Sequence, residues 1–412
     1  MREGWKSLPL GDVSTIVNGG TPKTRVSEYW GGDLLWITPA EMGGLSTPYL
    51  SNSRRKITDE GLRHSSASLV PPHSVILSTR APIGHVIINT EAMSFNQGCR
   101  GLVPCENLNY KYLYYFLYGN SELLNDLGNG TTFKELAASK LKQVKIPLPP
   151  LNEQKRIVAI LDEAFAGIEK AVANAEKNLA NARELFESRL NSLLSHHDAD
   201  WTETCLSDCA TLISTGPFGS LLHKSDYVTE GVPLVNPINI AGAEILPDDN
   251  KRISAETKGR LRAYILREGD IVIARRGEIG RCAVVTEKQN GWVCGTGCFF
   301  IRPKPEVNPY FLARMIKSYK YRKALEKQST GTTMKNLSNK ALSDLKIKLP
   351  AKQEQDMIVV KLEELSEHSR NLESIYQQKS TALTELKQPL LQKAFSGELT
   401  ANANNKRKEA AA

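Results

Sequence analysis

The first 150 residues alternate between short apolar runs and breaks made of glycine, proline, asparagine and serine. Runs rich in valine, isoleucine and leucine predict strands at residues 34–38, 74–79 and 85–90. The run 110–119, YKYLYYFLYG, repeats its apolar residues at three- and four-residue spacing, which predicts a helix. This part of the chain therefore reads as an α+β lobe with a mostly β centre.

From residue 153 onward the pattern changes to a heptad seam. Its apolar positions follow alternating gaps of four and three, with Arg189 in one of them, and comprise Leu161, Phe165, Ile168, Val172, Ala175, Leu179, Ala182, Phe186 and Leu193. A seam kept over several heptads predicts one long helix with a coiled-coil face. Some 40 residues of such a helix reach roughly 60 Å.

A second heptad seam begins after residue 355. It comprises Ile358, Leu362, Leu365, Leu372, Tyr376, Leu383, Leu386 and Leu390. Pro389 should interrupt this helix near Gln388, because proline has no backbone N–H and disfavours the helical conformation of the residue before it. The tail from residue 400 to residue 412 is expected to be frayed.

One motif occurs twice. Residues 130–154 read GTTFKELAASKLKQVKIPLPPLNEQ, and residues 331–355 read GTTMKNLSNKALSDLKIKLPAKQEQ. Matched residues differ in number by 201 throughout, from 130 and 331 to 154 and 355, so the two copies align without a gap. Two copies are too few for a solenoid and indicate the duplication of a half-molecule. Because the shift holds across both seams, we predict two equal helices that pack antiparallel, each attached to one lobe.

Composition narrows the class of protein. The 412 residues carry a net charge of +8 and a sequence pI near 9.0, which is compatible with a polyanionic partner. No apolar stretch reaches the ~18 residues of a membrane span. The seven cysteines are irregularly spaced, and no export signal precedes them, so we expect reduced thiols in a cytoplasmic protein.

Motifs of catalysis are not found in the sequence. It contains no GxxxxGK[ST] phosphate loop, no Asn/Asp-Pro-Pro-aromatic motif of amino-methylating enzymes and no GxSxG nucleophile motif. Its histidines and cysteines lack metal-ligand spacing. The string PLPPLNEQ at 147–154 fits an extended turn before a helix with Asn152 as its N-cap. We therefore expect no catalytic site, metal or cofactor in this chain.

Basic residues instead suggest contacts with nucleic acid, because lysine and arginine position phosphates and arginine reads guanine edges. A basic loop precedes Ile57 and its counterpart Ile253, and cations also follow matched strands and matched Gly-Thr-Thr turns. For each cation a plain solvated surface is about equally plausible, and for Trp36 and the asparagines so is a core or turn role. The candidates are Lys23, Arg25, Trp36, Arg54, Arg55, Lys56, Arg80, Lys134, Lys224, Asn236, Asn239, Lys251, Arg252, Arg275, Arg276, Arg281 and Lys335.

Taken together, these features resemble the specificity subunits of type I restriction–modification systems. The resemblance is carried by both GTT-x-K motifs, by IPLPPLNEQ at 146–154 and IKLPAKQEQ at 347–355, by the long helix after each, and by LLQKAFSGEL at 390–399. The second copy departs from the first at Lys348, Ala351 and Lys352.

The resemblance implies a non-catalytic subunit in which two target-recognition domains each read half of a split double-stranded DNA target. They would occupy residues 1–150 and 197–351, with spacer helices at 151–196 and 352–399. It also implies partners, namely two modification subunits that use S-adenosylmethionine to methylate adenine, and restriction subunits that use ATP and Mg²⁺. Three other classes stay open at this point: a self-sufficient methyltransferase or nuclease, a coiled-coil adaptor that binds only protein, and a dimeric regulator of transcription.

Overall fold

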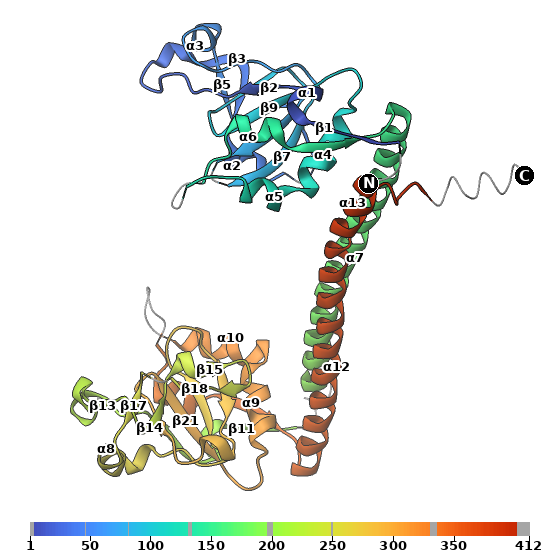
Figure 1. The fold of residues 1–412 in the computed structure, drawn as a ribbon. Helices are drawn as coiled ribbons and strands as arrows, with labels where there is room; N and C mark the ends of the chain where they lie inside the picture. The colour runs from blue at the N-terminus through green and yellow to red at the C-terminus, as the bar shows by residue number, and fades with distance from the viewer. Residues whose placement is uncertain are drawn as a thin grey trace, which may run out of the picture. The chain divides into compact units, whose positions relative to one another are not determined.

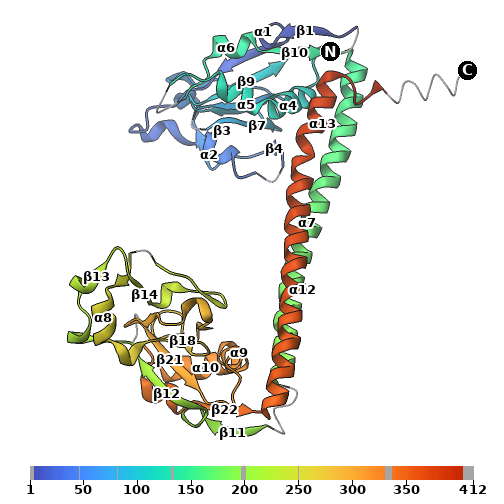
Figure 2. The same cartoon turned by 60° about the horizontal axis from the view of Figure 1, so that its bottom comes forward.

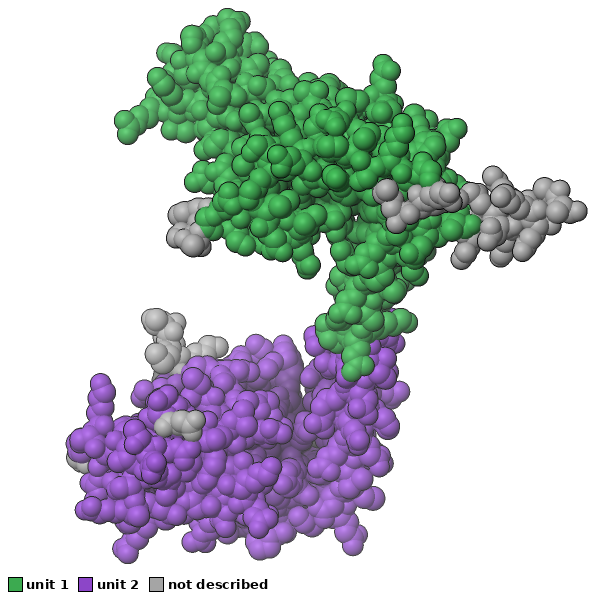
Figure 3. Space-filling model, viewed as in Figure 1, with its two compact units in different colours: residues 1–176, 377–412 green, residues 177–376 purple. Residues whose placement is uncertain are grey.

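The structure, a computed structural model, describes residues 4–45, 47–80, 82–130, 134–195, 201–248, 250–329 and 336–401. It divides into two compact units, residues 1–176 with 377–412 and residues 177–376 (Figure 3). Each unit holds one mixed lobe of strands and helices together with part of the long helices (Figure 1). The predicted α+β class with long helices is confirmed.

In the first lobe, three sheets surround the core. Their orders are β2-β9-β6-β7-β4, β5-β3-β8 and β1-β10. The strands are β1 (Lys6–Pro9), β2 (Ser14–Asn18), β3 (Trp30–Ile37), β4 (Tyr49–Leu50), β5 (Arg55–Ile57), β6 (Val75–Thr79), β7 (Ile83–Asn89), β8 (Met93–Phe95), β9 (Cys99–Pro104) and β10 (Lys145–Leu148). The helices are α1 (Leu10–Val13), η1 (Ser27–Tyr29), α2 (Pro39–Met42), α3 (Asp59–Arg63), α4 (Tyr110–Gly119), α5 (Ser121–Asp126) and α6 (Ala138–Gln143).

The run of buried residues in β6 shows why this lobe folds as it does. All five residues of the strand are buried, since β7 and β9 pair with it on either side and core residues cover both faces. A strand buried on both faces reads as a continuous apolar run rather than an alternating one, as residues 75–77 do. The buried hydroxyls that follow donate to backbone carbonyls, Ser78 to Pro82 and Thr79 to Gly98. All three strands predicted in this lobe and the helix at 110–119 are present, as β3, β6, β7 and α4.

The second lobe repeats most of these strand pairings and adds β13 and the pair β15-β16. Its sheets run β12-β21-β18-β19, β13-β17-β14-β20, β11-β22 and β15-β16. The strands are β11 (Thr202–Cys205), β12 (Ala210–Thr215), β13 (Tyr227–Val228), β14 (Val232–Val235), β15 (Ile240–Ala241), β16 (Glu244–Ile245), β17 (Arg252–Ile253), β18 (Ile271–Ala274), β19 (Cys282–Val284), β20 (Val293–Cys294), β21 (Cys298–Pro303) and β22 (Lys346–Leu349). The helices are η2 (Leu206–Cys209), η3 (Gly219–Leu221), η4 (Lys224–Asp226), η5 (Pro237–Asn239), α8 (Ala255–Arg260), η6 (Arg262–Tyr264), η7 (Glu287–Gln289), α9 (Pro309–Lys317), α10 (Tyr319–Gln328) and α11 (Asn339–Ser343).

Three helices form the long segments. α7 covers Leu151–Ser195 over 45 residues, α12 covers Lys352–Glu385 over 34, and α13 covers Lys387–Ser396. The break at Leu386 confirms the predicted effect of Pro389, which cannot donate to the carbonyl four residues earlier. The predicted N-cap Asn152 is wrong: α7 begins at Leu151, and the Pro150 carbonyl accepts from the N–H of Glu153 at 2.8 Å.

In each unit, α7 runs antiparallel to the later helices. Lys387 pairs with Glu169 at 3.1 Å in the first unit, and Arg183 pairs with Glu373 at 3.0 Å in the second. Fourteen residues forward on α7, from 169 to 183, thus correspond to fourteen residues back on the partner, from 387 to 373. α7 and the later helices therefore pair in the same antiparallel register in both units.

The heptad positions are buried to very different extents. Leu161, Phe165, Ile168 and Leu362 are buried, and the partly buried positions are Val172, Leu179, Phe186, Leu365 and Leu383. Two predicted interface residues differ from this pattern, since Leu372 is 41% and Leu386 50% exposed, and Leu190 rather than Arg189 is the buried residue of its turn. A straight helix of 3.6 residues per turn drifts away from a 3.5-residue repeat, and a pair of helices buries only a narrow stripe.

The C-terminal segment completes the first unit. α13 lies beside α4 in both views (Figure 1 and Figure 2). Phe395 meets Tyr112 and Phe116 edge to face, and Gln388 donates to the Gly119 carbonyl at 2.9 Å. Thr400, assigned above to a frayed tail, is buried and bonds to Glu153, while residues 402–412 lie outside the described residues.

Across the described ranges, no helix is both long and apolar enough to span a membrane.

Candidate nucleic-acid interface

The small sheet β5-β3-β8 carries a cluster of aromatic and basic side chains in the first lobe. The Arg55 guanidinium stacks on the Trp30 ring, 3.7 Å from its centroid, and Trp30 meets Trp36 edge to face. Arg55 is exposed, and no carboxylate pairs with it among the residues that the structure describes. A guanidinium held flat on an aromatic ring keeps its N–H edge available for a base or a phosphate.

The neighbours of Arg55 complete this surface. Arg54 is exposed and Lys56 partly buried, and the backbone N–H of Arg54 donates to Glu41 at 2.8 Å. The indole of Trp30 also donates to the Lys23 carbonyl at 3.4 Å, which brings the loop with exposed Lys23 and Arg25 to the same place. The structure thus brings together five of the predicted cations, Lys23, Arg25, Arg54, Arg55 and Lys56.

Trp36 is not available for contacts with DNA. It is 2% exposed, and its indole N–H donates to the Gly20 carbonyl at 2.9 Å. Together with Ile57 and Ala67 it forms the small core under this sheet. The interpretation as a core residue is therefore correct, and its place among the DNA-binding candidates is wrong.

A second group lies where β6 ends. Arg80 is exposed and forms an isolated bridge with Glu135, the residue after exposed Lys134. The N–H of Leu136 donates to the Thr79 carbonyl at 2.9 Å, which fixes the repeated motif against the strand end. Arg80 and the repeated motif are therefore neighbours, although Arg80 and Glu135 are 55 residues apart in the sequence.

The second lobe has the same arrangement at the end of β18. Arg276 is exposed and bridges Asn336, and the Leu337 N–H donates to the Arg275 carbonyl at 3.0 Å. Arg275 is partly buried, with its guanidinium 5.7 Å from the rings of Phe218 and Phe299. Burial lowers the pKa of Arg275, and the adjacent Arg276 lowers it further. Lys335, the counterpart of Lys134, lies outside the described residues.

The other cations of the second lobe are less free. Lys251 and Arg252 are partly buried, and Arg252 donates to the Gly231 carbonyl at 3.3 Å. Arg281 donates to the Pro237 carbonyl and pairs with Glu278, both at 3.2 Å. Lys224, at the start of η4, is exposed. Unlike Arg55, Arg252 and Arg281 therefore already use their guanidinium groups in bonds within the protein, whereas Lys224 is exposed as Arg55 is.

The two asparagines belong to a turn. The Asn239 side chain accepts the Asn236 N–H at 2.8 Å and donates to the Leu246 carbonyl at 2.9 Å. Asn239 is 4% exposed, so its prediction as a DNA contact is wrong and the turn role is correct. Asn236 is partly buried and lies against Gly295, which leaves its contact with DNA a prediction.

Sequence reasoning missed the glutamines that end the repeated motif. Gln154 and Gln355 are buried, and their amides bond to the turn before α4 or α9. The repeated motif contained a signal for this role, because both copies end in a glutamine just before the heptad seam. A side-chain amide that is buried there must form hydrogen bonds. It also missed Asp162, which accepts from Lys111 and from the Tyr115 hydroxyl, both at 2.7 Å.

The described part of the chain contains no candidate metal site. No group of three or more His, Cys, Asp or Glu side chains in that part is arranged so that it could hold a metal ion. All seven cysteines are free thiols, and burial raises the pKa of Cys99 and Cys298 to about 12, so both stay protonated. The geometry instead presents exposed cations on matching edges of two similar lobes.

Comparison with known proteins points to one family. Residues 2–176 and 199–379 match the family described as type I restriction modification DNA specificity domain. A type I restriction enzyme MjaIX specificity subunit from Methanocaldococcus jannaschii is 36% identical over 45% of this chain, which spans 43% of that relative. The EcoBI specificity subunit from Escherichia coli is 26% identical over 97% of this chain and 87% of its own.

Solved structures show the same fold. A chain from a structure concerned with assembly and conformational transition of a type I R-M system has a TM-score of 0.75 at 19% identity, covering 97% of this chain and 99% of that one. The HsdS subunit from Thermoanaerobacter tengcongensis has a TM-score of 0.63 at 19% identity, covering 97% and 98%.

Proposed function

This chain belongs to the type I restriction modification DNA specificity family, and from that premise we propose that it is the DNA-recognition subunit of a type I restriction–modification complex. The carrying observation is the pair of matching basic edges. Arg54, Arg55 and Lys56 precede Ile57 in one lobe, as Lys251 and Arg252 precede Ile253 in the other. A duplicated surface of this kind fits a target read in two halves.

In this proposal residues 1–150 read one half-site and residues 197–351 the other. The helices at 151–196 and 352–399 set the length of the unread gap between them. Cations at the lobe edges contact phosphates, which makes binding weaken as salt rises. An adaptor that binds only protein would have no use for the two basic edges.

Catalysis is assigned to partners in the cytoplasm. Two modification subunits that hold S-adenosylmethionine methylate an adenine in the target, which must be flipped out of the duplex to be reached. Restriction subunits supply ATP- and Mg²⁺-dependent cleavage. In this proposal the cofactors bind to the partner subunits, and this chain contributes the choice of sequence.

Within the first half-site we propose Arg55 as a base reader. Its guanidinium is stacked and exposed, and such a planar fork bonds to both acceptors of guanine in the major groove. Arg54, exposed beside it without a stacking partner, is better suited to a phosphate. For the second half-site we propose Arg276, the counterpart of Arg80, which is exposed at the end of β18.

The test is genome-wide mapping of methylated adenine in cells that express this chain with its modification subunit. We expect a split motif with two fixed halves and a fixed gap, lost when this chain is deleted. Replacing residues 1–150 by another lobe should change one half only. The absence of any chain-dependent motif, with the modification subunit shown to be active, would contradict the proposal.

Point variants sharpen the test. Arg55→Lys keeps the charge and loses the fork, so we expect one base of one half-site to be relaxed, with about 10- to 100-fold less discrimination. The matched control Arg54→Ala should weaken all sequences alike. Relaxed specificity in Arg54→Ala but not in Arg55→Lys would reverse the two roles.

A further inference from the structure

Gln154 and Gln355 occupy the same place in the two units. They lie 201 residues apart, in the first turns of α7 and α12, and are 0% and 2% exposed. Burial of an uncharged amide is unfavourable unless its donors and acceptor are bonded. Each glutamine meets that requirement with three hydrogen bonds to backbone groups.

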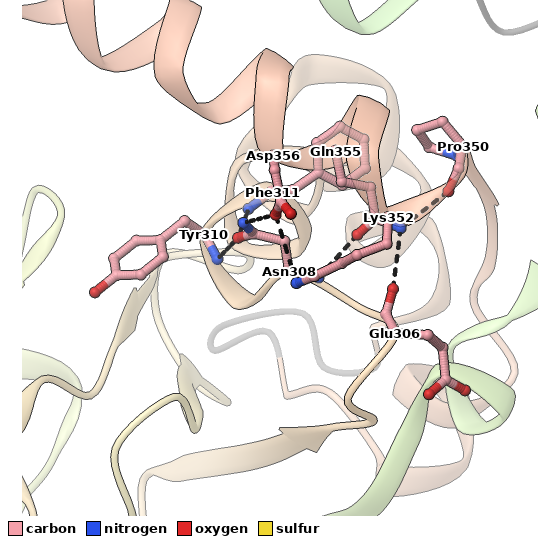
Figure 4. A network of polar contacts seen from close by, with 8 residues as sticks. All are labelled: Glu306, Asn308, Tyr310, Phe311, Pro350, Lys352, Gln355 and Asp356. Carbon is pink, nitrogen blue, oxygen red and sulfur yellow. Dashed lines mark hydrogen bonds and ion pairs between the residues drawn. The ribbon is translucent and has the colours of Figure 1, made fainter.

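The bonds are the same in both units. The Gln154 oxygen accepts the Asn109 N–H at 2.8 Å, and its amide nitrogen donates to the carbonyls of Asn107 and Pro149, both at 2.9 Å. In the second unit, Gln355 accepts the Asn308 N–H at 2.8 Å and donates to the carbonyls of Glu306 at 3.4 Å and Pro350 at 2.9 Å (Figure 4).

These partners lie in two different parts of each unit. Asn107 and Asn109 form the turn between β9 and α4, in the body of the lobe, whereas Pro149 follows β10 and leads into α7. The Asn109 side chain in turn caps α4 by accepting from the N–H groups of Lys111 and Tyr112. One amide therefore ties the long helix, the strand that enters it and the capped end of a lobe helix.

The same linkage holds in the second unit. The Asn308 side chain accepts from the N–H groups of Tyr310 and Phe311 at the start of α9, at 2.8 and 3.1 Å. Figure 4 shows Gln355 and Asp356 pointing from the helix toward this turn. A side chain that bonds only to backbone groups at a joint constrains the direction of the lobe relative to its own helix.

Small changes in that direction matter for a protein that reads a split target. A lobe of about 150 residues is roughly 30 Å across. A tilt of about 6° at the joint moves the far side of such a lobe by ~3 Å, close to the ~3.4 Å step between base pairs.

We propose that Gln154 and Gln355 are positioning residues that fix each lobe on its long helix and so set the gap length of the split target without touching DNA. The inference rests on the proposed function, because it requires lobes that read half-sites. In this inference the cations at the lobe edges determine which bases are read. The length of the gap is determined by the helices together with the two glutamines that hold the lobes on them.

The test uses Gln154→Met and Gln355→Met in the complete complex with the modification subunit. Methionine keeps the volume and removes all three hydrogen bonds, so a role in packing alone would survive it. The exposed neighbour Asn152 provides the control variant Asn152→Met. Two readouts apply: mapped methylated adenine in cells, and binding of purified complex to duplexes whose gap is one base pair shorter, unchanged or one longer.

We expect each glutamine variant to keep the bases of both halves and to raise at least tenfold the share of targets used with a gap altered by one base pair. The control should keep the wild-type gap. An unchanged gap in both variants would overturn the inference and leave the proposed function standing, whereas no split motif in the wild type would remove the function itself.

Two further outcomes also overturn the inference. A change of base preference would make the glutamines readers rather than positioning residues. Failure of both methionine variants to assemble at any temperature would make the bonds a requirement for folding. If only Gln154→Met fails, Gln355→Met decides, because Asn308, Asp356 and Lys352 give its joint additional contacts.

Discussion

In each unit the long helix meets its own lobe at a joint, which begins at Gln154 in the first unit and at Gln355 in the second. Further along the helix the joint of the first unit is aromatic and closely packed, whereas that of the second unit is charged and open. Phe165 meets Tyr115 and Tyr118 edge to face in the first unit, and its counterpart 201 residues later is Ser366. The cleft between lobe and helix has a volume of about 470 Å³ in the first unit and 1420 Å³ in the second.

The ionic contacts differ in the same way. Asp162 bonds to Lys111 and Tyr115 in the first unit, while in the second the matching position holds Glu363, one of several charged residues that line the larger cleft. The second unit instead places Asp356 between Asn308, at 2.6 Å, and Lys352, at 3.5 Å. Asp162 thus lies about two helical turns further along its helix than Asp356 does along its own, when the two units are matched by the shift of 201.

The glutamate before each glutamine shows a further exchange. Glu354 accepts from the Trp201 indole at 3.1 Å, whereas Glu153 accepts from the hydroxyl of Thr400, near the end of the chain. The contacts that recur are those between a side chain and the backbone, because the two lobes share backbone geometry. Contacts between two side chains differ from one unit to the other, because substitutions can change both side chains of such a pair.

The largest expected effect concerns the leucines that close each core. Leu391 is 2% and Leu190 7% exposed, and they are 201 residues apart. Changing either to alanine should reduce the unfolding free energy of its own unit by about 2–4 kcal/mol, because a cavity remains. Hydrogen exchange measured by mass spectrometry in increasing urea follows both units at once.

Leu185→Ala is the control for this pair, since Leu185 is 57% exposed and its loss should change little. Equal destabilisation of both units by Leu391→Ala alone would show that the units do not unfold separately, and would break the comparison.

A smaller effect is expected from Asp162→Ala, which leaves Lys111 and the Tyr115 hydroxyl without their acceptor. Because the Asp162 side chain is 40% exposed, water compensates in part. We expect a loss of about 1 kcal/mol in the first unit. Glu363→Ala, at the matching position, should stay within ~0.5 kcal/mol. An equal loss for both variants, measured by urea unfolding, would mean that the anchors are not distinct.

The smallest expected effect is a change in the pKa of Asp356. The hydrogen bond from Asn308 holds its pKa below the ordinary value of 3.8, against the opposing effect of burial, and Lys352 lowers it further. A carboxyl with a depressed folded pKa stabilises above its unfolded pKa, and this contribution is lost as pH falls through the folded pKa.

Asn308→Ala should therefore raise the Asp356 pKa toward 3.8, which NMR titration of the carboxyl carbon would measure. Asp162 lies outside this network and serves as the control. An unchanged Asp356 pKa would show that Asn308 does not hold the carboxylate in solution.

Local periodicity was sufficient for the elements of this protein. Residues 110–119 were predicted as a helix and form α4, and the position of Pro389 predicted the break before α13. The constant shift of 201 also predicted that both halves are built alike. These features depend on neighbours within a few residues, or on the identity of two copies, and both are visible in a sequence.

The roles of single polar and aromatic residues could not be predicted in this way. Trp36 and Arg55 are directly paired between β3 and β5, yet one is in the core and the other exposed on the Trp30 ring. Asn239 was a candidate for DNA contact as well as for a turn and closes a turn, and Gln154, which was not among the candidates, joins a helix to a lobe.

By itself, then, the sequence determined the duplicated α+β lobes, the long helices and the membership of a DNA-specificity family, because periodicity and repeated motifs are encoded residue by residue. Only the tertiary structure decided which cations stay exposed and how each helix is tied to its lobe. Those outcomes depend on partners such as Asn109 for Gln154, 45 residues away, which folding alone brings within hydrogen-bond distance.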